Sequence, residues 1–270
     1  MKKLIYGAMA LTIGLLIYAC NKEDVKQLKR ADESKANIVE DLNNIFSEIE
    51  NDRDEITTKS SPKLNVPLAN KQNPFDNTGV QHNEVLRHLS SLEFTESNVC
   101  NSIPAVNKEF EVEININCDE LLSIIDNGAN KTFDKKGNYK TDLLDDLLSE
   151  GKISNNEYIV VNTTVENVYD LDNLNQKIAL LKASENYARN SPFLTDIEKE
   201  RVQRTFAIYR YSTFYWEVEA EKLAAGPIAN LADAYATYWA MNSMQSPFQD
   251  GASIGIFAGV VSSAFVALGY

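Results

Sequence analysis

The sequence contains little of what catalytic and metal-binding sites are usually built from. Its 270 residues include only two histidines, His82 and His88. They do not form the HExxH pattern of zinc proteases, no Pro-Cys-x-x-Cys follows them as in zinc deaminases, and the GxSxG, Walker and dinucleotide-binding patterns are absent. We therefore expect no catalytic residue, no metal site and no cofactor, and we predict that the protein is not an enzyme.

Basic residues are also few. Lysine and arginine number 26 against 39 aspartates and glutamates, which gives a formal net charge of -13. An acidic protein without a basic stripe repels nucleic acids and anionic lipid surfaces, so we expect no nucleic-acid partner. Glycine (11 residues) and proline (7) are sparse, while 44% of the residues are hydrophobic. This is the composition of a globular chain long enough for one sizeable core.

The chain does have a distinctive N-terminus. Lys2-Lys3 is followed by an apolar run from Leu4 to Tyr18, and a small residue, Ala19, precedes Cys20. A charged start and an apolar run of about 15 residues are typical of a signal peptide, since a membrane-spanning helix needs roughly 20. We predict a signal peptide over residues 1–19. Its removal takes away two lysines and no acid, so the formal net charge moves from -13 to -15.

These residues resemble the signal of a bacterial lipoprotein, and with Lys22, Glu23 and Asp24 the chain resembles surface-exposed lipoproteins of Bacteroidetes, of an uncharacterised family. The resemblance implies that Cys20 becomes the mature N-terminus and carries acyl chains such as palmitate. It implies that Lys22-Glu23-Asp24 is the export signal to the outer face of the outer membrane. The protein would then contact the membrane through its lipid anchor alone. No activity follows from the resemblance.

Two further segments precede the main domain. Residues 20–56 are predicted to be the lipidated N-terminus and a charged helical tether, because apolar side chains recur there at helical spacing. A helix docked on the core and a coiled-coil stalk fit the same pattern. Residues 57–78 contain three prolines and no sustained periodicity, which predicts a linker.

We predict a mainly α-helical bundle over residues 79–270, with at most one short strand pair. Ser154 with Glu157, and Thr195 with Glu198, have the spacing of capping boxes and predict two helix starts. The alternation from Phe110 to Cys118 is the one strand-like pattern. Aromatic residues crowd into the helix expected after Thr195, where they would form core or line a ligand pocket.

Two cysteines lie beyond the signal segment. A disulfide between Cys100 and Cys118 would close a loop of about 18 residues and stabilise the fold by roughly 3 kcal/mol in the chain-entropy model. Oxidising surroundings outside the cytoplasm favour such a bond. Two buried free thiols are the alternative, and the spacing is not that of a zinc site.

The last twenty residues, 251–270, carry no charge. Small residues recur there every four positions and form a predicted helix-packing stripe, made of Gly251, Gly255, Gly259, Ser263 and Ala267. Small side chains allow close approach of a partner helix. We expect an apolar C-terminal helix buried within the bundle. A membrane-spanning helix and a glycine-zipper helix that inserts into a target membrane are the alternatives.

The sequence as a whole predicts an outer-membrane, lipid-anchored protein, exposed at the cell surface. Its helical domain would serve interaction or binding, with a protein or glycan ligand that the sequence does not identify. The rival hypothesis is a membrane-active, bacteriocin-like or pore-forming protein that uses its C-terminal helix.

Overall fold

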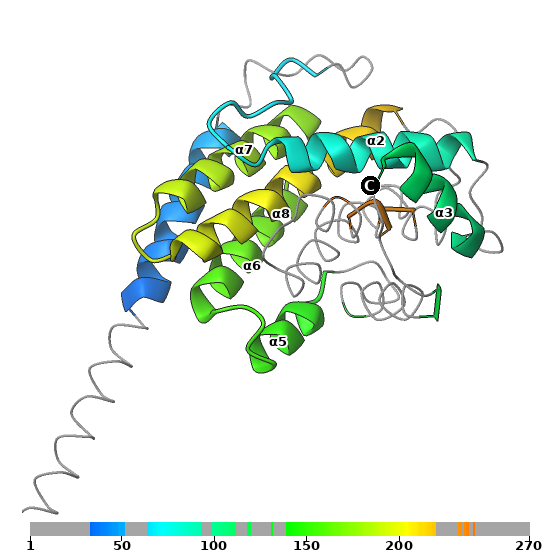
Figure 1. The fold of residues 1–270 in the computed structure, drawn as a ribbon. Helices are drawn as coiled ribbons and strands as arrows, with labels where there is room; N and C mark the ends of the chain where they lie inside the picture. The colour runs from blue at the N-terminus through cyan, green and yellow to red at the C-terminus, as the bar shows by residue number, and fades with distance from the viewer. Residues whose placement is uncertain are drawn as a thin grey trace, which may run out of the picture.

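The structure is a computed structural model. It describes residues 33–51, 64–92, 99–111, 118–119, 131, 139–219, 232–233, 235–237 and 240. In this part of the chain 78% of the residues are helical and there is no sheet. The predicted mainly α-helical bundle is therefore confirmed (Figure 1).

Residues 33–51 are helical. The helices that follow are α2 (Asn77–Ser91), α3 (Val99–Glu109), α5 (Asp142–Ser149), α6 (Asn155–Tyr169), α7 (Leu174–Asn190) and α8 (Asp196–Phe214), and α8 continues into the π-helix η2 (Tyr215–Glu219).

Local sequence signals set the starts of three helices. The Ser154 hydroxyl accepts a hydrogen bond from the Glu157 amide, and the Glu157 carboxylate accepts one from the Ser154 amide, so the first capping box is confirmed at α6. The second, at α8, is confirmed in the same way. Helix α7 begins at Leu174, because the Asn173 side chain accepts hydrogen bonds from the amides of Asn175 and Gln176 and caps the helix there.

Helix α8 is the centre of the bundle. It packs against α7 and α2, and every residue from Val202 to Thr213 is buried. Figure 1 shows α8 between α7 and α6, with α2 across its end. The aromatic residues Tyr209, Tyr211, Tyr215 and Trp216 are buried here. The core interpretation of the aromatic run is therefore the one the structure supports.

Residues 33–51, from the segment expected as a tether, pack onto the bundle. Ile38 and Leu42 are 0% and 1% exposed and belong to the main hydrophobic core, while Ile45 and Ile49 are partly buried against it. These four residues recur every three or four positions and form one apolar stripe, which a neighbouring helix pair can cover. Of the alternatives for this segment, the docked helix is the one found over residues 33–51.

Residues 64–76, from the expected linker, form a polar strap across α7 and α8. The Asn175 side chain accepts hydrogen bonds from the amides of Asn65 and Val66. The Lys182 ammonium donates to the Pro67 carbonyl at 2.9 Å. Side chains of other elements thus satisfy several backbone groups of the strap that a helix would satisfy internally.

Several predictions concern residues outside the described ranges. These include the C-terminal helix over residues 251–270 and the alternation from residue 112 to 117; Phe110 and Glu111 form a turn. None of the described helices is long and apolar enough to cross a membrane.

Gly79 gives a testable consequence of how closely α2 approaches α8. A Cβ atom at this position would lie 2.6 Å from the Ala207 carbonyl oxygen and would also collide with the Tyr211 ring. Helix propensity alone would favour alanine by about 1 kcal/mol. We expect the reverse, because overpacking should lower the free energy of unfolding of Gly79→Ala by about 1–3 kcal/mol. Urea denaturation would measure it.

The control for this prediction is Glu84→Ala, which changes an exposed residue of the same helix. Its unfolding free energy should stay within about 0.5 kcal/mol of the parent. A Gly79→Ala protein that is more stable than the parent would show that the two helices can separate without loss.

Candidate binding groove

Two open hollows lie end to end along one side of the helix over residues 33–51. The first has a volume of about 630 Å³ and the second of about 500 Å³, both within the range of about 300–1,000 Å³ for small-ligand sites. The helix contributes Asn37 to the first and Asp41 to the second, one turn apart. The α7–α8 loop contributes Phe193 and, directly before it, Pro192. We call the two hollows together the groove.

Hydrogen bonds hold the helix that forms one wall of the groove. The Ser34 hydroxyl donates to the Asn156 side chain of α6 at 3.3 Å. At the far end, the Gln176 side chain of α7 donates to the Ile49 carbonyl at 3.1 Å. Because both ends of the helix are fastened, the wall is part of the rigid bundle.

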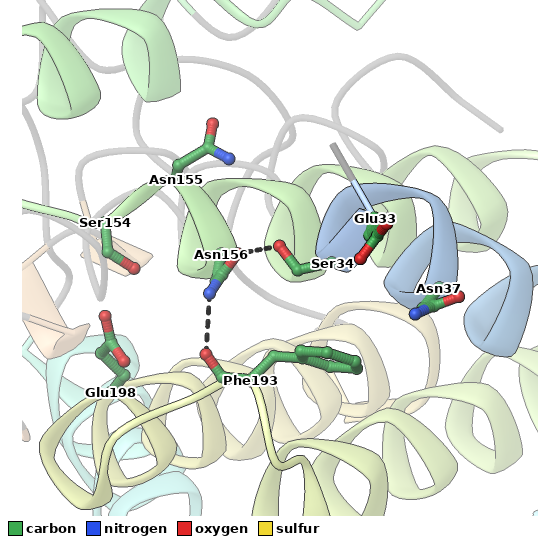
Figure 2. A pocket seen from close by; sticks show the side chains of 8 residues that line it. All are labelled: Glu33, Ser34, Asn37, Ser154, Asn155, Asn156, Phe193 and Glu198. Atoms are coloured by element: carbon green, nitrogen blue, oxygen red, sulfur yellow. Dashed lines mark hydrogen bonds between the residues drawn. The ribbon is translucent and has the colours of Figure 1, made fainter. Parts of the chain in front are cut away.

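The first hollow is built where α6 and α8 begin. Its lining residues are Glu33, Ser34, Asn37, Ser154, Asn155, Asn156, Phe193 and Glu198. Figure 2 shows Asn156 between Ser34 and the Phe193 carbonyl, to which its amide donates at 2.7 Å, with the Phe193 ring directed toward Asn37. This bond fixes the loop that carries Phe193 against the start of α6.

The two capping boxes bring the carboxylates of Glu157 and Glu198 close to this hollow, and Glu198 lines it. Burial would raise the pKa of Glu198, but hydrogen bonds from Ser154 and from Thr195 outweigh it and lower the pKa, so the carboxylate is charged. Glu157 is buried, and burial raises its pKa despite bonds from the Ser154 amide and the Arg201 guanidinium. Arg201 pairs with Glu157 at 2.7 Å, and its charge also helps to lower the pKa of Glu198.

The second hollow lies between the same helix and the end of α7. Its lining residues are Asp41, Ile45, Ala183, Asn186, Tyr187, Asn190, Ser191 and Pro192. Burial raises the pKa of Tyr187 to about 12, so its hydroxyl is neutral at physiological pH. Tyr187 and Ile45 supply apolar surface, while Asn186 and Asn190 supply amides.

The linings of both hollows share one chemical character. Carboxylates are present at Glu33, Asp41 and Glu198, amides and hydroxyls are numerous, and among the described residues no lysine or arginine lines either hollow. Such a surface cannot hold a phosphate or another anion by ion pairing. It can hold groups that both donate and accept hydrogen bonds, next to apolar faces.

A second polar cluster surrounds His82, but it is closed. The ring Nδ1 lies 3.0 Å from the Asn83 side-chain oxygen, and Nε2 lies 3.5 Å from an Asp233 carboxylate oxygen. That same oxygen accepts hydrogen bonds from Ser212 and Trp216, each at 2.7 Å. Ser212 therefore donates to the carboxylate and not to the histidine, so the arrangement differs from a catalytic triad. All are buried, which favours a structural role.

The third cluster fastens the polar strap to the core. Arg210 and Glu185 are fully buried and paired at 2.8 Å, and Arg210 also pairs with Asp76 and donates to the Leu68 carbonyl. Asn70 and Asn73 donate to the other Glu185 oxygen at 2.7 and 3.0 Å. Although burial opposes it, the two carboxylates raise the pKa of Arg210. These bonds join α7 and α8 to the strap.

The site residues predicted from the sequence lie mainly elsewhere. Cys20, Lys22-Glu23-Asp24 and the stripe within residues 251–270 are outside the described ranges, so they stay predictions. Cys118 is disulfide-bonded, and the side chains of Cys20 and Cys100 are outside the description, so the pairing with Cys100 also stays a prediction. Among the described residues, no group of three or more histidines, cysteines, aspartates and glutamates could hold a metal ion.

Sequence reasoning missed the groove. Its amides come from residues 37, 155–156, 186 and 190, which are far apart in the chain and belong to ordinary polar helix positions. The run Asn155-Asn156 after a capping serine was the only local signal, since polar residues there face solvent next to a helix start.

Comparisons of the chain with protein-family models, with curated proteins and with solved structures find no match.

Proposed function

We propose that the protein is a lipid-anchored binding protein of the outer membrane, exposed at the cell surface, whose helical domain binds its ligand in the groove. The observation that carries the binding role is the groove itself. It combines two neighbouring hollows of about 630 and 500 Å³ with polar side chains on several elements and aromatic side chains from α7 and the loop that follows it. The other two polar clusters are buried and use their groups internally, so they support stability and not exchange with solvent.

The anchor and the location rest on the N-terminal sequence. The signal-like segment, Cys20 and Lys22-Glu23-Asp24 support lipidation and export. An acidic domain beyond the anchor favours solubility next to an anionic surface.

The test of the anchor uses the full chain in a Gram-negative host that displays lipoproteins on its surface. We expect palmitate to label the protein, Cys20→Ser to abolish the label, and external protease to digest the domain on intact cells. Alanine replacement of Lys22, Glu23 and Asp24 should leave the label but protect the domain from protease. An unlabelled, secreted parent protein would overturn the anchor, and leakage of dye from vesicles treated with the full chain would favour the membrane-active alternative.

A further inference from the structure

We propose that the groove binds a neutral oligosaccharide of several sugar units. The inference deepens the proposed binding function and rests on it. Four features of the groove carry it: its charge, its amides, its aromatic faces and its length.

Charge excludes the commonest ligand classes first. Glu33, Asp41 and Glu198 contribute three carboxylates to a lining whose described residues include no lysine or arginine. An anionic ligand would enter against this charge and find no lysine or arginine among the described lining residues to pair with. Phosphorylated and acidic sugars, nucleotides and acidic peptides therefore fit poorly.

The amides favour a neutral ligand, because they can both donate and accept hydrogen bonds. Asn37 and Asn155 are exposed, and their side chains form no hydrogen bond with the described residues (Figure 2). Each carboxamide presents two donors and an acceptor, and each carboxylate presents acceptors only. A hydroxyl donates one hydrogen bond and accepts others, so adjacent hydroxyls on a sugar ring can pair with an amide and a carboxylate together.

The aromatic faces suit the remaining side of a sugar. Phe193 in the first hollow and Tyr187 in the second are partly buried against the core, and each contributes to the lining of its hollow. Aromatic side chains offer large apolar contact at low entropic cost, which suits the C–H faces of a sugar ring.

The length favours several units over one small molecule. The helix lines the groove from Glu33 to Ile45, and at 1.5 Å per residue that stretch is about 18 Å long. Peptides are less well matched. The described part of the chain has no strand edge to pair with an extended backbone, and an amphipathic helix needs a mainly apolar groove.

The test measures binding of neutral tetrasaccharides of glucose, mannose, galactose, xylose and N-acetylglucosamine to the lipidated full chain in detergent micelles, by isothermal titration calorimetry. We expect at least one to bind. Phe193→Ala should weaken that binding about tenfold through loss of the aromatic face. Asn37→Ala, an exposed change that leaves the core intact, should weaken it several-fold through loss of its hydrogen bonds.

Matched controls separate the groove from general effects. Tyr169→Ala removes another partly buried aromatic residue that packs on the same core but lines neither hollow. Asn44→Ala removes an exposed amide from the same helix, and Asn44 lines neither hollow. Both controls should bind as the parent does.

Three results would overturn the proposal. One is failure of every tetrasaccharide to bind at millimolar concentration. Another is binding that Phe193→Ala and Asn37→Ala leave unchanged. The third is binding of tetralysine that Asp41→Asn abolishes while no tetrasaccharide competes, which would assign the groove to a basic peptide. The third result would still agree with the proposed binding function. Failure of the palmitate and protease experiments would overturn the surface anchor but would not bear on the oligosaccharide proposal.

Discussion

Replacing Arg210 with methionine should destabilise the domain by about 3–5 kcal/mol, the usual cost of leaving a buried charge without its partner. Glu185 would lose the guanidinium at 2.8 Å and keep only the amides of Asn70 and Asn73 in a fully buried position. The strap would also lose its bond to the Leu68 carbonyl. Urea denaturation followed by circular dichroism would measure the change.

The matched control is Arg87→Met. Arg87 pairs with Glu219 at 2.8 Å, but the two side chains are 49% and 29% exposed. Solvent screens such a pair, so its loss should cost less than about 1 kcal/mol. The double variant Glu185→Leu with Arg210→Met removes both buried charges and should recover part of the stability lost in Arg210→Met. Equal effects of Arg210→Met and Arg87→Met would show that the buried pair contributes no more than a surface pair.

Acid should destabilise the protein through His82. Burial lowers the pKa of this histidine from 6.5 to about 4, although Asn83 and Asp233 act in the opposite direction. The unfolded chain therefore binds a proton between those two pH values that the folded chain does not. The neutral, buried His82 ring contributes to the free energy of unfolding, and this contribution is fully present above about pH 6.5. It is lost as the pH falls toward 4, at about 1.4 kcal/mol per pH unit and about 3 kcal/mol in all.

Two measurements isolate this effect from the titration of carboxylates. The unfolding free energy of His82→Gln should fall less steeply from pH 6.5 to 4.5 than that of the parent, by about 1.4 kcal/mol per pH unit. The ring resonances of His82 in the folded parent should titrate with a midpoint near pH 4 in NMR spectra. A midpoint near 6.5 would contradict the prediction, because a solvated ring would then be the correct description.

Features whose cause is local were predictable. The two capping boxes need only Ser154 with Glu157 and Thr195 with Glu198, three residues apart, and both formed as expected. Apolar spacing likewise predicted a helix within residues 20–56, of which residues 33–51 are helical, but it could not say what covers the stripe, since that depends on helices more than 100 residues away.

Features that depend on distant partners were not predictable. Residues 70 and 73 were assigned to a linker because asparagines in a proline-containing segment usually mark a loop. Their actual partner is Glu185, 115 and 112 residues further along the chain. The central position of helix α8 was not predictable for a similar reason. Polar residues such as Gln203, Arg204 and Arg210 are buried in it, so its sequence shows no distinct apolar face. The groove exists only once these elements are assembled.

The bonds from Arg210 to Leu68 and Asp76 join positions 142 and 134 residues apart. During synthesis, Leu68 and Asp76 leave the ribosome before Arg210, so these bonds cannot form until most of the domain has been synthesised. Contacts of such sequence separation slow folding, because the loop must close before they form. Nascent chains that stop before α8 would thus hold the strap without Arg210, although α7, its other partner, is already present. Completion of α8 sets the point in synthesis at which the domain can close.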